Sequence, residues 1–253
     1  MKKVILKSVD VQKSFANNGS QNHVLNSVNM EVYDGDFTVI MGFSGAGKST
    51  LLYCLSGMDK PTSGKVYYMD EEISGLKEKK MASLRAEKFG FVFQQSHLVS
   101  NLTLFENVAV TGYLSAKRSA KEVQKRAIAL LKKMNVEKAK DRLPSQVSGG
   151  EAQRTAIARA IINEPGILFA DEPTGALNKR NTQEVLDLLS QINKEGQNIL
   201  MVTHDMRAAI RGTRFLYLED GKVIGEMMMP PFTEEDAKNR EKQLDAWLTS
   251  MSW

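Results

Sequence analysis

Cysteine is almost absent from the chain, because Cys54 is the single example among 253 residues. A disulfide within the chain is therefore impossible, and a reducing compartment is the expected environment. Cys54 lies inside a predicted helix, where we expect a buried, small apolar side chain rather than a nucleophile.

Long apolar segments are absent as well. No run approaches the roughly 18–20 apolar residues that a membrane-spanning helix needs. The chain begins with Lys2 and Lys3 but lacks the apolar core of about 7–15 residues that is typical of a signal peptide. If this protein acts at a membrane, we expect another chain to provide the membrane-spanning part.

A strong excess of either charge is also missing. Lys and Arg number 34 against 30 Asp and Glu, for a net charge of +4. The lysines are spread along the chain, which favours solvated helix faces over a nucleic-acid surface. Hydrophobic residues make up 42% and charged residues 25% of the chain, which suits one large or two small globular domains.

One stretch, by contrast, carries a specific signal. It matches the phosphate-loop pattern G-x-x-x-x-G-K-[ST] at every position and consists of Gly42, Phe43, Ser44, Gly45, Ala46, Gly47, Lys48 and Ser49, followed by Thr50. An apolar, β-prone run precedes it and a helical run follows it. This arrangement gathers backbone N–H groups and a helix dipole around one point, where a phosphate chain can bind. Lys48 is expected to reach the β- and γ-phosphates, and Ser49 to hold Mg²⁺.

The flanking sequence alternates between strands and helices. An antiparallel β patch is predicted for residues 1–33, with a turn-rich loop at 17–22. Further segments are predicted as strands at 65–69, 89–95, 166–170 and 198–202. A polar helix is predicted at 77–87, a helical insert at 96–163, and a hairpin at 215–227 with an Asp-Gly turn. Repeated strand–helix units imply a mostly parallel sheet covered by helices.

Residues 228–253 form a separate tail. Thr233 to Asp236 matches a capping box, and the apolar residues that follow fall on one helical face, namely Leu244, Trp247, Leu248 and Met251. The favoured interpretation is a helix that packs on its own domain. The alternative is a docking helix for a partner.

Polar residues follow several of the predicted strands. Asp171 ends a buried strand, where a carboxylate can orient Mg²⁺, and Glu172 is a candidate general base. His204 ends the next strand, where it could contact the γ-phosphate or be structural. Gln94 could meet Mg²⁺ or the attacking water, and Gln95 is the competing candidate.

A second anion site is predicted at a helix start, formed by Ser148, Gly149, Gly150 and Glu151. It lies 100 positions after Lys48. Two phosphate sites can serve one nucleotide if they come from different subunits. The simplest arrangement is a C2 dimer with two ATP molecules in the interface between the copies.

Over residues 3–227 the chain resembles an ABC-transporter ATPase subunit. The resemblance is carried, in chain order, by the phosphate loop, Gln94, the segment 147–151, the segment 168–173 and His204. One branch of that family is similar in more detail, at residues 90–94, 106–108, 146–151 and 170–177. That branch includes the macrolide-export, lipoprotein-release and bacitracin-resistance ATPases, whose members pair with separate permeases.

The resemblance implies an α/β fold, a P-loop NTPase (RecA-like) parallel-sheet core with an antiparallel β subdomain and an inserted α-helical subdomain. The ATPase domain would span residues 1–227, with the helical subdomain at about 96–163 and a C-terminal extension at 228–253. Phe15, just before the loop of the β patch, would stack on the base, although a core or edge role is equally compatible with its position. Gln94 would sense the γ-phosphate and Mg²⁺, and His204 would be the switch residue.

The implied partners are ATP, Mg²⁺, a second copy of the chain and an integral membrane permease. The permease's coupling helix would bind near Gln94 to Glu106. The expected location is the cytoplasmic face of a bacterial membrane, and the expected work is export or removal of an antimicrobial peptide, a lipoprotein or another amphiphile.

Two positions depart from the family pattern. Glu151 replaces the commoner Gln, a substitution that is frequent in this branch. Asn178 stands where Asp is usual, and because Asn carries no charge, coupling between the two sites could be altered.

The alternative hypothesis is a non-transport relative that acts on nucleic acid or ribosomes. The 100 positions between Lys48 and Ser148 leave no room for the long coiled coil of DNA-repair relatives, and one cassette is present where translation relatives have two. A small GTPase or a kinase is disfavoured, because residues 178–181 do not complete the guanine motif and the Ser-Gly-Gly element would be unexplained.

Overall fold

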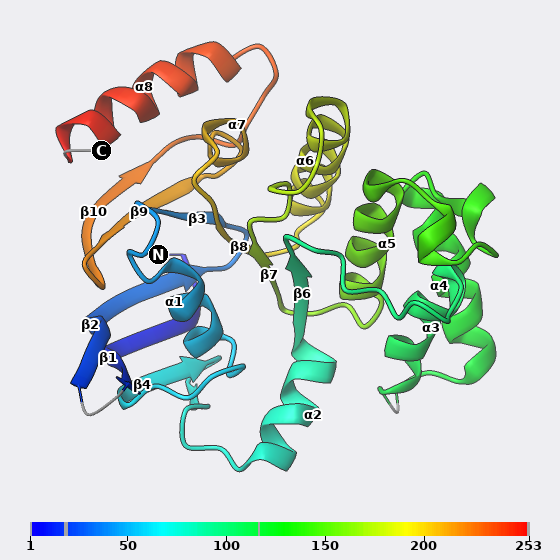
Figure 1. Ribbon diagram of the computed structural model, residues 1–253, viewed down its shortest axis with the longest axis horizontal. Coiled ribbons are helices and arrows are strands. Elements are labelled where there is room, and N and C mark those ends of the chain that lie inside the picture. Colours follow the sequence, from blue (N-terminus) through cyan, green and yellow to red (C-terminus); the bar gives the residue numbers. More distant parts are fainter. Residues whose placement is uncertain (1, 18–19, 116, 252–253) are drawn as a thin grey trace. The chain divides into compact units, whose positions relative to one another are not determined.

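The computed structural model describes residues 2–17, 20–115 and 117–251. The chain divides into two units, which are residues 1–81 together with 198–253, and residues 82–197. Figure 1 labels most of the helices and strands of each unit.

The first unit begins with a long antiparallel hairpin of β1 (Val4–Asn17) and β2 (Ser20–Tyr33). β4 (Ser63–Tyr68) and β5 (Glu71–Glu72) extend it to a four-stranded sheet in the order β2-β1-β4-β5. The predicted antiparallel patch is therefore confirmed. The loop predicted for residues 17–22 was too long, because Gln21 and Asn22 pair with Ala16 and Phe15 in the ladder. Residues 18 and 19 of that loop lie outside the described residues.

Parallel strands form the other sheet of the first unit. β3 (Phe37–Met41) is buried at every residue and lies between β8 (Ile199–Val202) and β9 (Arg214–Glu219), both parallel to it. α1 (Lys48–Leu55) follows β3, and Cys54 on this helix is buried as predicted. Burial raises the pKa of the Cys54 thiol to about 12, so this thiol is a packing group at neutral pH.

β9 and β10 (Lys222–Met228) form the predicted hairpin. Asp220 and Gly221 between them have φ values of 46° and 72°. Two successive residues with positive φ are the signature of the type I′ turn that Asp-Gly favours. The Asp-Gly prediction is therefore confirmed.

The tail helix α8 (Ala237–Ser250) packs on its own unit, as the favoured interpretation predicted. Leu244 and Leu248 are fully buried, and the Trp247 ring meets Tyr217 of β9 edge-on at 6.5 Å. The predicted start at Thr233 was wrong. The Thr233 hydroxyl does accept a hydrogen bond from the Asp236 amide, but this bond closes a turn, and the first helical bond runs from the Arg240 amide to the Asp236 carbonyl.

The second unit contains two parallel strands, β6 (Phe89–Phe93) and β7 (Ile167–Asp171). α2 (Glu78–Lys88) leads into β6 and α6 (Lys179–Lys194) follows β7. Between the strands lie α3 (Leu104–Tyr113), α4 (Ala120–Lys133) and α5 (Gly149–Ile161). Each of these three helices starts with a capping box, formed by Thr103 and Glu106, Ser119 and Glu122, and Ser148 and Glu151.

Residues 96–103 are irregular, although the helical pattern was predicted to begin at 96. The fully buried side chain of Asn107 on α3 organises this loop. Its amide oxygen accepts a hydrogen bond from the Val99 amide at 2.7 Å, and its amide nitrogen donates to the carbonyls of Val99, Leu102 and Thr103. A buried amide with these partners replaces the backbone bonds that a helix would have made.

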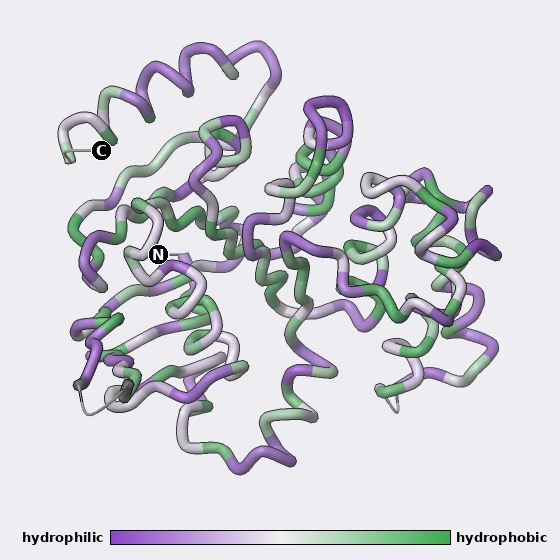
Figure 2. The backbone as a smooth tube through the Cα atoms, in the orientation of Figure 1, coloured by the Kyte–Doolittle hydropathy of each residue, from purple (hydrophilic) through white to green (hydrophobic). Residues whose placement is uncertain are grey.

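Hydrophobic colours in Figure 2 are concentrated on the parallel strands of both units, and α8 is mostly hydrophilic outside its buried stripe. Among the described residues, no helix has the length and apolar character that crossing a bilayer requires.

Replacing Ser119 with Ala removes the side-chain acceptor at the start of α4. The expected cost is about 1 kcal/mol of unfolding free energy, because the amide of Glu122 loses its cap. Urea unfolding followed by circular dichroism measures this. The control is Lys121→Ala, an exposed change on the same helix, and equal midpoints for the two variants would contradict the prediction.

Candidate functional site

The phosphate loop joins β3 to α1, and two of its glycines lie against neighbouring backbone. A Cβ atom on Gly42 would be 2.2 Å from the Leu218 carbonyl oxygen, and one on Gly47 would be 2.8 Å from the Val24 carbonyl oxygen. Gly47 also N-caps α1 with a φ of 99° and no side-chain cap. A helix start without a side-chain cap has N–H groups that suit an anion, so this loop has the shape of a phosphate cradle.

Lys48 lies across the mouth of this loop. Its side chain is largely buried, with 7% exposed, and its Nζ donates to the carbonyls of Gly42 at 2.7 Å and Phe43 at 2.9 Å. These contacts fix a positive charge over the glycine backbone, where a phosphate chain would require it. The predicted residues 42–50 are thus gathered at one place.

His204 emerges at the same edge of the first unit's parallel sheet as the phosphate loop. Ile40 pairs with Val202, and the Thr203 amide donates to the Ile40 carbonyl at 3.2 Å. His204 is the next residue and is exposed. Carboxyl ends of parallel strands are where α/β proteins bind ligands, so the register supports a common site for His204 and the loop.

The ring of Phe15 is exposed at 44% on β1, which rules out the core role that its position left open. The Nζ of Lys13 lies 5.0 Å from the ring centroid and forms an ion pair with Asp59 at 2.7 Å. One side of the ring therefore has a cation against it. Base stacking by Phe15 stays a prediction.

In the second unit, Gln94 and Glu172 leave neighbouring strands side by side. Their preceding residues, Phe93 and Asp171, are register partners in the β6–β7 ladder. Asp171 is buried, and Glu172 has a φ of 45°, an unusual value for a residue other than glycine. Gln94 lies against the loop after Glu172, since a Cβ on Gly175 would be 3.0 Å from its Nε2. Both Gln94 and the competing candidate Gln95 are exposed.

Gln153 is a functional candidate that sequence reasoning missed. Its side chain is 1% exposed, and its Nε2 donates to the carbonyls of Phe93 and Pro173, both at 2.7 Å. One amide on α5 therefore holds the exits of both strands, next to Gln94 and Glu172. The sequence signal was weak, because a Gln inside a helix looks like a surface residue.

The N-terminus of α5 is capped by a capping box between Ser148 and Glu151. Ser148 Oγ accepts a hydrogen bond from the Glu151 amide at 3.2 Å, and the Glu151 carboxylate accepts from the amide and the hydroxyl of Ser148, both at 2.8 Å. These hydrogen bonds lower the pKa of the Glu151 carboxyl, and the bond from the Ser148 amide has a larger effect than the bond from its hydroxyl. The carboxylate therefore stays ionised at the helix start where an anion is predicted to bind.

Gly150 and Asn178 are connected through α6. A Cβ on Gly150 would be 2.4 Å from the side chain of Asn181, so glycine there lets α6 approach α5 closely. Asn178 N-caps α6, with its Oδ1 accepting from the Asn181 amide at 3.0 Å. An Asp at 178 would cap in the same way, so the departure at this position removes a charge without removing the cap.

Metal ligands are less evident from the geometry. Within residues 2–17, 20–115 and 117–251, no group of three or more His, Cys, Asp or Glu side chains could hold a metal ion. The candidates Ser49, Gln94 and Asp171 supply hydroxyl, amide and carboxylate oxygens. These hard donors fit Mg²⁺, which takes few protein ligands and shares the rest with phosphates and water.

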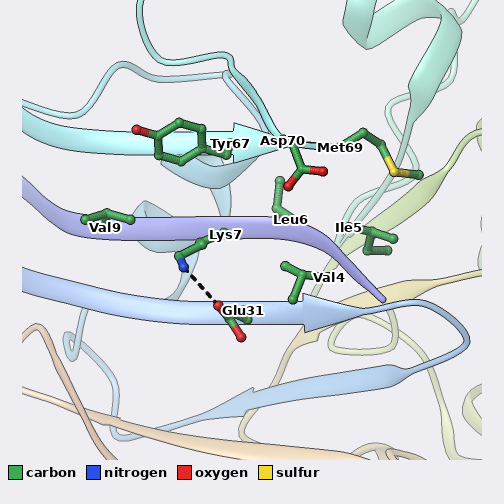
Figure 3. A pocket seen from close by; sticks show the side chains of 9 residues that line it. All are labelled: Val4, Ile5, Leu6, Lys7, Val9, Glu31, Tyr67, Met69 and Asp70. Carbon is green, nitrogen blue, oxygen red and sulfur yellow. Dashed lines mark ion pairs between the residues drawn. The ribbon is translucent and has the colours of Figure 1, made fainter. Parts of the chain in front are cut away.

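A separate surface hollow of about 410 Å³ lies on the antiparallel sheet. Figure 3 shows Lys7 and Glu31 pointing toward one another across it, as an ion pair of 3.1 Å. The remaining lining residues are Val4, Ile5, Leu6, Val9, Tyr67, Met69 and Asp70. None of the predicted site residues lines this hollow, so it is not the candidate site.

Comparison with protein families matches the model described as ABC transporter to residues 25–175. The lipoprotein-releasing system ATP-binding protein LolD of Aquifex aeolicus is 45% identical over 204 residues, which cover 81% of this chain and 91% of LolD. The macrolide export ATP-binding/permease protein MacB of Haemophilus ducreyi is 37% identical over 227 residues, which cover 89% of this chain and 32% of MacB.

A solved structure described as a dimeric post-hydrolysis state of the ATP-binding cassette MJ0796, bound to ADP and Pi, is also similar. It matches with a TM-score of 0.83 and 38% identity, over 90% of this chain and 100% of the cassette. The structural likeness confirms the predicted α/β P-loop fold, and the relatives confirm the resemblance drawn from the motifs.

Gln153→Met removes a buried donor from two carbonyls while keeping the side-chain length. The expected loss is about 2–4 kcal/mol of unfolding free energy, because both carbonyls become unsatisfied. Urea unfolding measures it, and hydrogen exchange should quicken around residues 94 and 173–175. Gln183→Met, the same change at an exposed position of α6, is the control. Equal losses of unfolding free energy in both variants would contradict the role of Gln153 in holding the two strand ends.

Proposed function

Because the chain belongs to the ABC transporter family and is an ATP-hydrolysing transporter subunit, we propose that it powers a separate integral membrane permease. The proposed work is export or removal of an antimicrobial peptide, a lipoprotein or another amphiphile. The proposed location is the cytoplasmic face of a bacterial membrane. The observation that carries the proposal is the phosphate cradle, where Gly42 and Gly47 pack on backbone carbonyls and Lys48 lies across the mouth.

Three residues would carry the chemistry. Glu172 acts as general base on the attacking water, an effect worth roughly 10²–10⁴-fold in rate. Gln94 holds that water or the γ-phosphate from the neighbouring strand exit, and His204 contacts the γ-phosphate. The contact between Gln94 and the loop after Glu172 supports a joint action of these two side chains.

Mg²⁺ would be held by Ser49, Asp171 and Gln94, and it would neutralise charge on the transferred phosphoryl group. The oxygen donors of these side chains support this choice of ion. Phe15 would stack on the base through the ring face away from Lys13.

Two copies would close on two ATP molecules. In this arrangement the start of α5 in one copy, formed by Ser148, Gly149, Gly150 and Glu151, would be the second anion site and would meet the nucleotide held by Lys48 of the other copy. The similar cassette MJ0796 is described as dimeric, which supports the proposal. Hydrolysis then separates the copies and moves the permease.

The permease would contact the region near Gln94 to Glu106. Val99 in this region is apolar and exposed, and Val110, Tyr113 and Leu114 continue the exposed apolar positions to the end of α3, with Leu114 at 69%. Exposed apolar side chains gathered in one segment are a mark of an interaction site. The relative LolD is described as part of a lipoprotein-releasing system, which supports an amphiphilic cargo.

Glu172→Gln should bind ATP and fail to hydrolyse it, so that the closed dimer accumulates. The expected result is a doubled mass by light scattering when ATP and Mg²⁺ are added, and a monomer without ATP. The control is Glu172→Gln with Lys48→Met, which should stay monomeric because phosphate binding is lost. If Glu172→Gln binds ATP and remains monomeric, the dimer proposal fails for the isolated chain, and adding Asn178→Asp tests whether the missing charge is the cause.

Leu114→Asp should weaken binding to the permease, because it puts a charge into the apolar segment. The measurement is co-purification, in detergent, with a candidate permease that is co-expressed with this chain. Ile128→Asp, an equally drastic change at an exposed apolar position of α4, is expected to retain binding. Loss in both variants, or in neither, would argue against this docking segment.

A further inference from the structure

The C-terminal tail is the part of the chain that the proposed function leaves unused. Its helix α8 turns Leu244 and Leu248 inward and lays Trp247 and Met251 over Gly225 of β10. A Cβ on Gly225 would be 3.1 Å from each of these two side chains. The apolar face of α8 is therefore occupied within its own unit, and any role of the tail must act through that unit.

The first turn of α8 carries a buried cation. Arg240 is 1% exposed, and its guanidinium donates to three backbone carbonyls on two segments. Nε donates to Ile210 at 2.8 Å, Nη1 to Pro230 at 2.6 Å, and Nη2 to Gly212. A buried charge is tolerated only where polar partners replace water, so these carbonyls fix the guanidinium in one place.

Two of these carbonyls belong to the end of α7 (Met206–Ala209). Ile210 is the C-cap of α7, and Gly212 follows in the same turn. Carbonyls at a helix end lack partners within the helix. Arg240 supplies those partners and thereby ties α7 to α8.

The other end of α7 begins beside His204. Asp205 N-caps α7, its Oδ1 accepting from the Arg207 amide at 2.9 Å, and its own amide donates to Thr203 Oγ1 at 3.0 Å. His204 lies between Thr203 and Asp205. The short segment 203–212 therefore follows β8 at one end and is hydrogen-bonded to Arg240 at the other.

A second contact of the tail reaches the same segment. The guanidinium of Arg211 lies 4.1 Å from the ring centroid of the buried Phe232, and its NH1 is 3.5 Å from Glu234. The Met229 amide donates to the Thr213 carbonyl at 2.9 Å. The tail thus contacts residues 210–213, which follow directly on α7.

We propose that Arg240 is a positioning residue for ATP hydrolysis, which holds α7 and through it sets the place of His204. This inference rests on the role given to His204 in the proposed function. The tail would then hold His204 in place indirectly, through α7. Displacement of α8 would lower the rate of ATP hydrolysis without changing the phosphate loop.

The test uses the full chain and Arg240→Met, which keeps the length of the side chain and removes its donors. We expect kcat for ATP to fall about tenfold, with KM for ATP changed by less than about twofold because Lys48 and Phe15 are untouched. Lys242→Met, at an exposed position of the same helix, should keep kcat. Hydrogen exchange should quicken in residues 203–212 and stay unchanged in α1.

A double-mutant cycle separates positioning from loss of stability. In a His204→Ala background, measured in single-turnover reactions, Arg240→Met should lower the rate no further. The inference would be overturned if Arg240→Met lowered the rate by the same factor in the wild-type and His204→Ala backgrounds. It would also be overturned if Arg240→Met left kcat unchanged in the wild-type background. If His204→Ala alone leaves kcat unchanged, the role of His204 fails, and this outcome is distinct from failure of Arg240 alone.

Arg240→Lys covers the case in which the Met variant does not fold. Lys keeps the charge but cannot donate to three carbonyls in a fixed fork. We expect a smaller fall in kcat, about threefold, with faster exchange in residues 203–212. A folded Arg240→Lys protein with wild-type kcat and wild-type exchange would overturn the inference.

Discussion

The close approach of the phosphate-loop backbone to two carbonyl oxygens is the constraint on which the first unit depends. Gly42 lies against Leu218 of β9, and Gly47 lies against Val24 of β2. One loop therefore needs a parallel strand on one side and the antiparallel hairpin on the other. The Gly221 amide, in the turn after β9, adds a hydrogen bond to the Ala46 carbonyl. Because Gly42 and Gly47 have no side chains, the phosphate loop can pack against Val24 and Leu218, two segments that are almost two hundred positions apart in the chain.

Single buried polar side chains do the corresponding work elsewhere. Asn107 organises the loop after Gln95, Gln153 holds two strand exits, and Arg240 holds the end of α7. In each case the partners include backbone carbonyls at or just beyond the ends of regular elements. Such carbonyls must be satisfied when buried. A side chain on a stable helix satisfies them at fixed geometry, so rigid helices define the shape of the functional loops.

The sequence predicted what local patterns determine. The apolar run of β3, the Asp-Gly turn at 220–221 and the cap at Ser148 each depend on residues that are neighbours in the chain. The start of the helical insert was predicted too early because Asn107, not a helix, satisfies residues 99–103. Gln153 and Arg240 were missed for the same reason, since their acceptors lie 10 to 60 positions away and leave no periodic signal.

Glu151 shows how one motif serves two purposes. Its capping box has the same hydrogen bonds as those of Thr103 and Ser119, so local stability alone accounts for it. Gln would cap the helix equally well, and the difference is a negative charge at the predicted anion site. A phosphate bound at this predicted site would meet the N–H dipoles at the start of α5 while an ionised carboxylate lies nearby. Because this repulsion would be screened by salt, the charge of Glu151, and not its cap, would make closure of the proposed dimer depend on ionic strength.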